Sequence, residues 1–81
     1  MRLQLYQRDD CHLCDQALAV LAAVRAPEFD SIFIDGQPLL EAAYGSRVPV
    51  LVAAGGQALD WPFDPARLRA WLAGLGAGEG A

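Results

Sequence analysis

The sequence predicts an α/β domain built on a four-stranded mixed sheet flanked by helices. Two observations lead to this prediction. Short runs rich in β-branched and aromatic residues alternate along the chain with longer segments of helical periodicity. The chain has 81 residues, of which 54% are hydrophobic and 20% charged, and a mean hydropathy of +0.22, which suits one packed domain. We assign residues 1–75 to this domain and residues 76–81 to a flexible tail, because glycines recur there.

The first half of the chain predicts a β-α-β unit. Residues 1–6 alternate in side-chain type, as in a strand with one buried face. Residues 11–24 carry an apolar stripe at helical spacing, and either Asp9 or Asp10 can cap this helix. Residues 31–35 are β-branched and aromatic, which favours a second strand. We therefore expect the helix to connect two strands of one sheet.

The second half predicts a short helix, a hairpin and a closing helix. Residues 38–44 have proline in the first turn and a glycine beyond the last one. Residues 48–54 form a nearly continuous apolar run, as in a central strand, and a pair of glycines then favours a tight turn into an edge strand at residues 57–61. Asp64 followed by Pro65 begins the last helix. The expected order is β-α-β-α-β-β-α.

Charge and hydropathy exclude several classes of partner. The formal net charge is -4 and the sequence pI is about 4.6, so the chain lacks the basic field that nucleic acid or an anionic membrane surface requires. No run approaches the roughly 18 apolar residues of a membrane span, and no secretory leader begins the chain. We therefore expect a cytoplasmic protein, acting as a monomer, with no nucleic acid and no membrane as partner.

Two cysteines carry the main functional signal. Cys11 and Cys14 are the only cysteines, and they are separated by two residues after a strand and at the opening of a helix. This spacing brings both sulfur atoms within disulfide reach. Backbone N–H groups and the helix dipole favour a thiolate at Cys11, so we predict Cys11 as the nucleophile and Cys14 as the resolving cysteine.

Two other interpretations of this pair are less favoured. A zinc site usually needs four ligands, and His12 is the only histidine in the chain, so we expect no metal. Two buried and inert cysteines would conflict with the polar residues beside them. His12 is interpreted as a surface residue that modulates the local potential rather than as a general base, because thiol exchange needs no base once the thiolate exists. Leu13 is either an exposed contact for a partner or part of the inner face of the helix.

Aromatic residues near the end of the chain have two interpretations. Trp61 and Phe63 are candidates for a contact surface for a partner, since aromatic residues concentrate in such places. For Trp61, a place in the core is an equal alternative. Trp71 shares its helical spacing with Leu68, Leu72 and other apolar residues, which favours the core.

With these elements in place, the chain resembles the glutaredoxin branch of the thioredoxin-fold proteins, and in particular its short bacterial glutaredoxin-like members. The residues that carry the resemblance are the strand, loop and Cys-X-X-Cys helix start at 6–14, the Val48-Pro49 pair before the third strand, and the terminal hairpin followed by a helix. The resemblance implies a thioredoxin-like fold. It also implies a cis peptide bond at Pro49, although only about 5–6% of X-Pro bonds in folded proteins are cis.

The resemblance further implies a set of substrate-binding residues. The backbone of Val48 is expected to pair with the chain of the substrate, and Pro49 to pack beside the cysteines. Arg8 is expected to meet a carboxylate of glutathione, for which a guanidinium is a suitable partner, and Asp64 to meet its amino group. Glutathione would then be the reductant or a co-substrate, with no bound cofactor. The other interpretations are that Arg8 is a surface arginine balanced by neighbouring aspartates and that Asp64 is a helix cap.

The chain departs from the family pattern at three places. Arg47 stands where threonine is usual, and residues 61–63 (Trp-Pro-Phe) stand where two glycines are usual. His12 and Leu13 replace proline and tyrosine between the cysteines. Because the glycines permit close approach of a ligand, these departures bear on glutathione binding, and they place Arg47, His12 and Leu13 among the candidate specificity residues.

The leading hypothesis is a small thiol-disulfide oxidoreductase that reduces protein disulfides or glutathionylated substrates by dithiol exchange. A second hypothesis is an iron–sulfur or metal carrier, in which Cys11 from two subunits and two glutathione molecules hold a cluster. A third is a binding module that keeps the thioredoxin fold and has weak redox activity.

Overall fold

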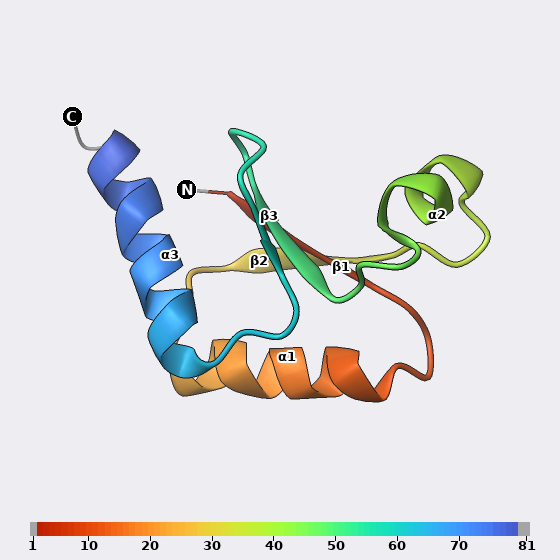
Figure 1. The fold of residues 1–81 in the computed structure, drawn as a ribbon, viewed down its shortest axis with the longest axis horizontal. Coiled ribbons are helices and arrows are strands. Elements are labelled where there is room, and N and C mark those ends of the chain that lie inside the picture. The colour runs from red at the N-terminus through yellow and green to blue at the C-terminus, as the bar shows by residue number, and fades with distance from the viewer. Residues whose placement is uncertain (1, 80–81) are drawn as a thin grey trace.

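The protein forms one four-stranded sheet with three helices around it. The structure, a computed structural model, describes residues 2–79 and the side chains of residues 2–75. Along the chain the elements are β1 (Leu3–Gln7), α1 (His12–Ala23), β2 (Phe29–Phe33), α2 (Pro38–Tyr44), β3 (Val50–Ala53), β4 (Ala58–Asp60) and α3 (Pro65–Glu79) (Figure 1). The predicted order β-α-β-α-β-β-α and the α/β class are confirmed.

The strands lie in the spatial order β2-β1-β3-β4. Strand β1 pairs in parallel with β2, whereas β1 with β3 and β3 with β4 are antiparallel, so the sheet is mixed as predicted. Leu5 lies opposite Ser31 on one side and Leu51 on the other. The β-α-β unit and the terminal hairpin are therefore both present, joined through the central strands β1 and β3.

One face of the sheet holds the core. Leu3 and Leu5 of β1 are fully buried, and helices α1 and α3 supply the side chains that cover them, including Leu21 and Leu68. Trp71 is partly buried against the same cluster, in agreement with the sequence-based interpretation. The core thus joins both long helices to the inner face of the central strands.

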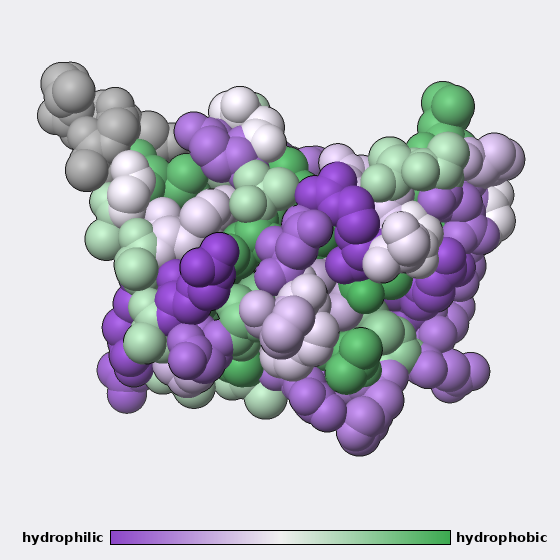
Figure 2. Space-filling model, in the orientation of Figure 1, coloured by the Kyte–Doolittle hydropathy of each residue, from purple (hydrophilic) through white to green (hydrophobic). Residues whose placement is uncertain are grey.

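Helix α2 lies apart from the core, at the end of the molecule opposite α3 (Figure 1). None of its seven residues is buried. It contacts the sheet through Tyr44, whose ring stacks on Tyr6 with centroids 4.1 Å apart and an interplanar angle of 18°. Figure 2 shows an apolar projection over this helix, where Leu39 is 86% exposed. In residues 2–79 no helix is long and apolar enough to cross a membrane.

The boundaries of several elements differ from the prediction. The second strand begins at Phe29 rather than Ser31, because pairing with Leu3 sets its register. Helix α3 continues to Glu79, so the expectation that glycines end it before residue 76 is wrong. Glycine lowers helix stability but keeps the N–H and C=O groups that the helix needs. Met1 of the predicted first strand and residues 80–81 of the predicted tail lie outside the described residues.

The predicted hairpin turn, a turn after β2 and the predicted cap of the last helix are present. Gly36 follows Asp35 in a turn at φ +74°, and Gly56 at φ +91° closes the hairpin, donating its N–H to the carbonyl oxygen of Ala53 at 2.9 Å. A positive φ favours glycine at both positions. Asp64 caps α3, since its Oδ1 accepts the backbone N–H of Arg67 at 2.8 Å.

Candidate active site

A disulfide joins Cys11 and Cys14 at the start of α1, with their Cα atoms 5.1 Å apart. Cys11 is the N-cap residue in extended backbone conformation, and its Sγ accepts the backbone N–H of Cys14 at 3.1 Å. The prediction that Asp9 or Asp10 caps this helix is therefore wrong. Asp10 instead adopts a φ of +52° and turns the chain into the helix.

The two sulfur atoms differ in exposure. Cys14 is 1% exposed and faces the core together with Ala17 and Leu21, whereas Cys11 is only partly covered. His12 is exposed, and Leu13 is 46% exposed, so Leu13 belongs to the surface rather than the inner face of α1. A partner thus meets Cys11 first.

The Val48-Pro49 pair lies at the same edge of the sheet as the loop that leads to Cys11. Val50 pairs with Tyr6, so the residues before β3 lie beside the residues after β1. The Val48–Pro49 bond is cis, which confirms what the resemblance implied, and Pro49 is fully buried. The N–H of Val48 donates to the carbonyl oxygen of Tyr44 at 3.0 Å, so this donor already has a partner within the chain.

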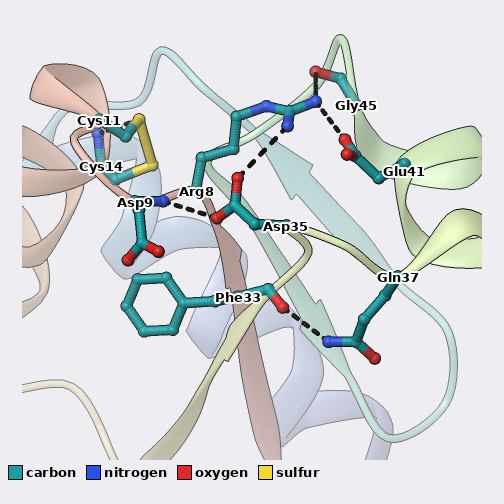
Figure 3. A network of polar contacts seen from close by, with 9 residues as sticks. All are labelled: Arg8, Asp9, Cys11, Cys14, Phe33, Asp35, Gln37, Glu41 and Gly45. Carbon is teal, nitrogen blue, oxygen red and sulfur yellow. Dashed lines mark hydrogen bonds and ion pairs between the residues drawn. A yellow bond between two sulfur atoms is a disulfide. The ribbon is translucent and has the colours of Figure 1, made fainter.

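Arg8 takes part in a polar network beside the disulfide (Figure 3). Its Nη2 lies 2.6 Å from Oε1 of Glu41 and donates to the carbonyl oxygen of Gly45 at 3.2 Å. Its Nη1 lies 3.6 Å from Oδ1 of Asp35, while Oδ2 of the same carboxylate accepts the N–H of Asp9 at 2.8 Å. The carboxylates that balance Arg8 therefore come from distant parts of the chain, not from its two aspartate neighbours in sequence.

Arg47 is likewise engaged within the chain. It forms a two-point ion pair with Asp60, and its guanidinium carbon lies 5.4 Å from the centre of the Tyr44 ring. The hydrogen bonds from Arg47 hold the pKa of Asp60 below its usual value, and the same bonds raise the pKa of Arg47. Burial, together with the neighbouring Tyr44, raises the pKa of Tyr6.

The segment after β4 completes this edge of the sheet. The backbone N–H of Trp61 donates to the carbonyl oxygen of Pro49 at 3.2 Å, and the Trp61–Pro62 bond is also cis. This second cis bond was not among the sequence-based predictions. The Trp61 ring meets Phe63 edge to face, with centroids 5.0 Å apart. Phe63 is 4% exposed and belongs to the core, so the prediction that it forms part of a contact surface is wrong. A depression of about 360 Å³ lies at the start of α3, lined by Pro62, Phe63, Asp64 and Arg67.

The structure thus brings Cys11, Cys14, Arg8, Val48 and Pro49 to one edge of the sheet. Within residues 2–79, no three His, Cys, Asp or Glu side chains are grouped so that they could hold a metal ion. Asp35 and Glu41 are the site residues that sequence reasoning missed. Their partner Arg8 lies far away along the chain, so no local pattern identifies them.

A parallel β-α-β unit, a cis proline before the third strand and a Cys-X-X-Cys pair at the helix start define a thioredoxin-fold protein with a dithiol site. The chain belongs to the family described as glutaredoxin-like domain (DUF836), whose family model matches residues 2–73. The predicted resemblance and the thioredoxin-like fold are therefore confirmed.

Solved structures and curated relatives agree with this assignment. The X-ray structure of the structural-genomics target XcR50 from X. campestris is 64% identical, with a TM-score of 0.87 over 89% of this chain and 96% of that one. The solution structure of Ne2328 from Nitrosomonas europaea is 32% identical, with a TM-score of 0.72 over 86% and 88%. The Mycobacterium tuberculosis protein Rv0508, described as uncharacterized, is 32% identical over an alignment of 80 positions that covers 89% of this chain and 82% of that protein.

Proposed function

We propose that this protein is a small thiol-disulfide oxidoreductase that reduces protein disulfides or glutathione mixed disulfides through Cys11 and Cys14. The observation that carries the proposal is the asymmetry of the pair, in which a partly exposed Cys11 caps α1 and a buried Cys14 lies one turn behind it. The helix N-terminus and the N–H of Cys14 favour a thiolate at Cys11, and thiolates are the attacking species in disulfide exchange.

The proposed reaction has two exchange steps. In the first, the Cys11 thiolate attacks one sulfur of the substrate disulfide, which forms a mixed disulfide and releases the other half of the substrate as a thiolate that takes a proton from water. In the second, Cys14 loses its proton and attacks the sulfur of Cys11. This step releases the reduced second half and forms the Cys11–Cys14 disulfide. Two electrons thereby pass from the protein to its substrate.

A thiol reductant must return these two electrons. We propose glutathione, of which two molecules would be oxidised to glutathione disulfide in each cycle, with the protein acting as a monomer in the cytoplasm, where thiols are kept reduced. Val48, Asp64 and the exposed residues between the cysteines are the proposed contacts of the substrate, and the cis bond to the buried Pro49 sets the direction of the Val48 backbone. The capping bond of Asp64 uses Oδ1, and a carboxylate has a second oxygen with which to accept from an amino group.

The test is a mixed-disulfide trap. A Cys14→Ser variant, reduced and mixed with a glutathionylated peptide or a protein disulfide, should accumulate a covalent adduct through Cys11, because the resolving thiol is missing. Mass spectrometry of the intact protein and of its peptides locates the adduct. A Cys11→Ser variant is the matched control and should form no such adduct. Absence of an adduct with both kinds of substrate would contradict the proposed function.

A further inference from the structure

The polar network around Arg8 connects two segments that are far apart in the sequence. One segment is the loop at residues 8–10, which leads directly into Cys11. The other is the end of α2, from which the chain continues to Pro49. Arg8 belongs to the first segment and contacts Glu41 and Gly45 in the second. In Figure 3 its side chain extends toward these two residues, while the disulfide lies on the other side of the view.

We propose that Arg8 and Asp35 are positioning residues for thiol exchange, which hold the loop that carries Cys11 in place against the segment that leads to Pro49. The inference rests on the proposed function and deepens it. It gives Arg8 a role different from the one implied by the family resemblance, in which its guanidinium binds a carboxylate of glutathione.

The surroundings of the guanidinium support this role. Two carboxylates and one backbone carbonyl surround the guanidinium, and the Arg8 side chain is 34% exposed. A carboxylate from a substrate would have to displace Glu41, at 2.6 Å, or approach a site where Glu41 and Asp35 repel it. The paired guanidinium is therefore better suited to holding the chain than to binding an anion.

The backbone of residues 9 and 10, directly before Cys11, forms a turn that the Arg8 network holds in place. Asp10 has a φ of +52°, a left-handed conformation that aspartate adopts more readily than most residues but less readily than glycine. Such a conformation persists where surrounding contacts impose it. The N–H of Asp9 is bound by Oδ2 of Asp35 at 2.8 Å, immediately before this residue. Asp35 thus fixes the turn that places Cys11 at the start of α1.

Gly45 leaves room for the same network. A Cβ atom at this position would overlap the carbonyl oxygen of Glu41 and lie 3.2 Å from Nη2 of Arg8. A side chain at position 45 would therefore shift either the end of α2 or the guanidinium. The contact between the Arg8 guanidinium and the end of α2 therefore depends on the absence of a side chain at position 45.

The experiment measures the rate constant for reduction of the Cys11–Cys14 disulfide in the whole protein by two reductants. Dithiothreitol has no carboxylate, whereas glutathione has two. Asp35→Ala removes the acceptor for Asp9 and should slow both reductants roughly tenfold, as misplacement of a reacting group does. Asp35→Asn keeps an acceptor oxygen and should stay within about twofold of the wild type. Circular dichroism and the thermal midpoint verify that each variant is folded.

Asp30→Ala is the matched control. Asp30 lies in β2 and pairs with Arg2 at 2.9 Å, so the variant removes an equivalent carboxylate away from the network. It should leave both rates unchanged. An equal loss of rate in Asp30→Ala and Asp35→Ala, or no loss in either, would overturn the positioning role.

Arg8→Lys keeps the proposal testable if Asp35→Ala does not fold. Lysine retains the charge but cannot reach Glu41, Asp35 and the Gly45 carbonyl together. It should slow both reductants by a similar factor. Where Asp35→Ala folds, the effects of Arg8→Lys and Asp35→Ala should combine less than additively, because both residues act in one network. A loss confined to glutathione would make Arg8 a ligand group and overturn the inference. The trap experiment above is independent of these rates, so the proposed function and the positioning role can fail separately.

Discussion

Arg47 and Asp60 face each other in a two-point ion pair, with Nε to Oδ2 at 3.1 Å and Nη2 to Oδ1 at 2.8 Å. Arg47 lies in the loop after α2, and Asp60 is the last residue of β4. The pair therefore connects the segment before the cis Val48–Pro49 bond to the edge of the sheet. Arg47 stands at the position where glutaredoxins usually have threonine, and in this chain its side chain forms an ion pair that joins two segments of the fold.

The Arg47–Asp60 pair should give the protein a stability that depends on pH on the acid side. The fold lowers the pKa of Asp60, so the carboxylate contributes stability above its unfolded pKa of about 3.9, and this contribution is lost as the pH falls through the lower folded pKa. Because both side chains are well exposed, we expect a contribution of less than about 1 kcal/mol. Urea unfolding of the wild type and Asp60→Asn between neutral pH and the acid limit measures the difference.

The control for this prediction is Arg47→Gln. In that background, Asp60→Asn should no longer change the pH dependence, because the hydrogen bonds that lower the Asp60 pKa are gone. High salt should also reduce the difference in the wild type. A difference that is unaffected by Arg47→Gln would show that another group causes it.

Leu21 and Leu39 provide a matched test of the core. Leu21 is 1% exposed on the inner face of α1, whereas Leu39 is 86% exposed on α2. Leu21→Ala should lower the free energy of unfolding by roughly 2–5 kcal/mol, through lost burial and the cavity left behind. Leu39→Ala should change it by less than about 0.5 kcal/mol. Chemical denaturation of both variants compares the same substitution in two environments, and similar losses would contradict the described packing.

Asp64 should matter for stability through its capping bond. Asp64→Ala removes the acceptor for the N–H of Arg67 and should cost about 0.5–2 kcal/mol, whereas Asp64→Ser should restore most of this loss. Serine carries no charge, so under the proposed glutathione contact the KM for glutathione should still rise in Asp64→Ser. Denaturation curves and steady-state kinetics on the same two variants separate the cap from the ligand role. An unchanged KM in Asp64→Ser would leave Asp64 as a cap alone.

Two glycines should respond to alanine in opposite directions. Gly74 lies within α3 with open space around its missing Cβ, so Gly74→Ala should stabilise the protein by about 0.5–1 kcal/mol. Gly56 closes the hairpin at φ +91°, and Gly56→Ala should destabilise it by roughly 1–2 kcal/mol. Thermal unfolding monitored by circular dichroism gives both signs. Destabilisation by Gly74→Ala would contradict the helical conformation at this position.

The elements of the fold could be predicted because their signals are local. Helix α2 begins at Pro38 and ends before Gly45, as its proline and glycine indicate. The position of β2 could not be predicted to the residue, because its register depends on the pairing of Phe29 with Leu3 in another strand. The continuation of α3 past residue 75 was missed for a related reason, since the penalty of each glycine is smaller than the cooperative gain of an established helix.

The reactive cysteine pair of the candidate site could be predicted from the sequence, whereas the ion pairs around Arg8 could not. The spacing of Cys11 and Cys14 identified the reactive pair, and the family resemblance identified the cis bond before Pro49. The partners of Arg8 could not be found, because the two nearest acidic residues in sequence are not the ones that the fold brings to it. Long-range ion pairs follow from the folded geometry, which a charge pattern along the chain does not describe.

Helix α2, which buries none of its residues, also has a consequence for hydrogen exchange. The stack of Tyr44 on Tyr6 and the ion pair between Glu41 and Arg8 attach it to the sheet. Elements with few buried contacts open locally at a free energy below that of global unfolding. Amides of α2 should therefore exchange faster than those of β1 or of the inner face of α1. The central strand β1 and the inner face of α1, which carries Cys14, then open only with the whole fold, whereas α2 opens many times before the protein unfolds.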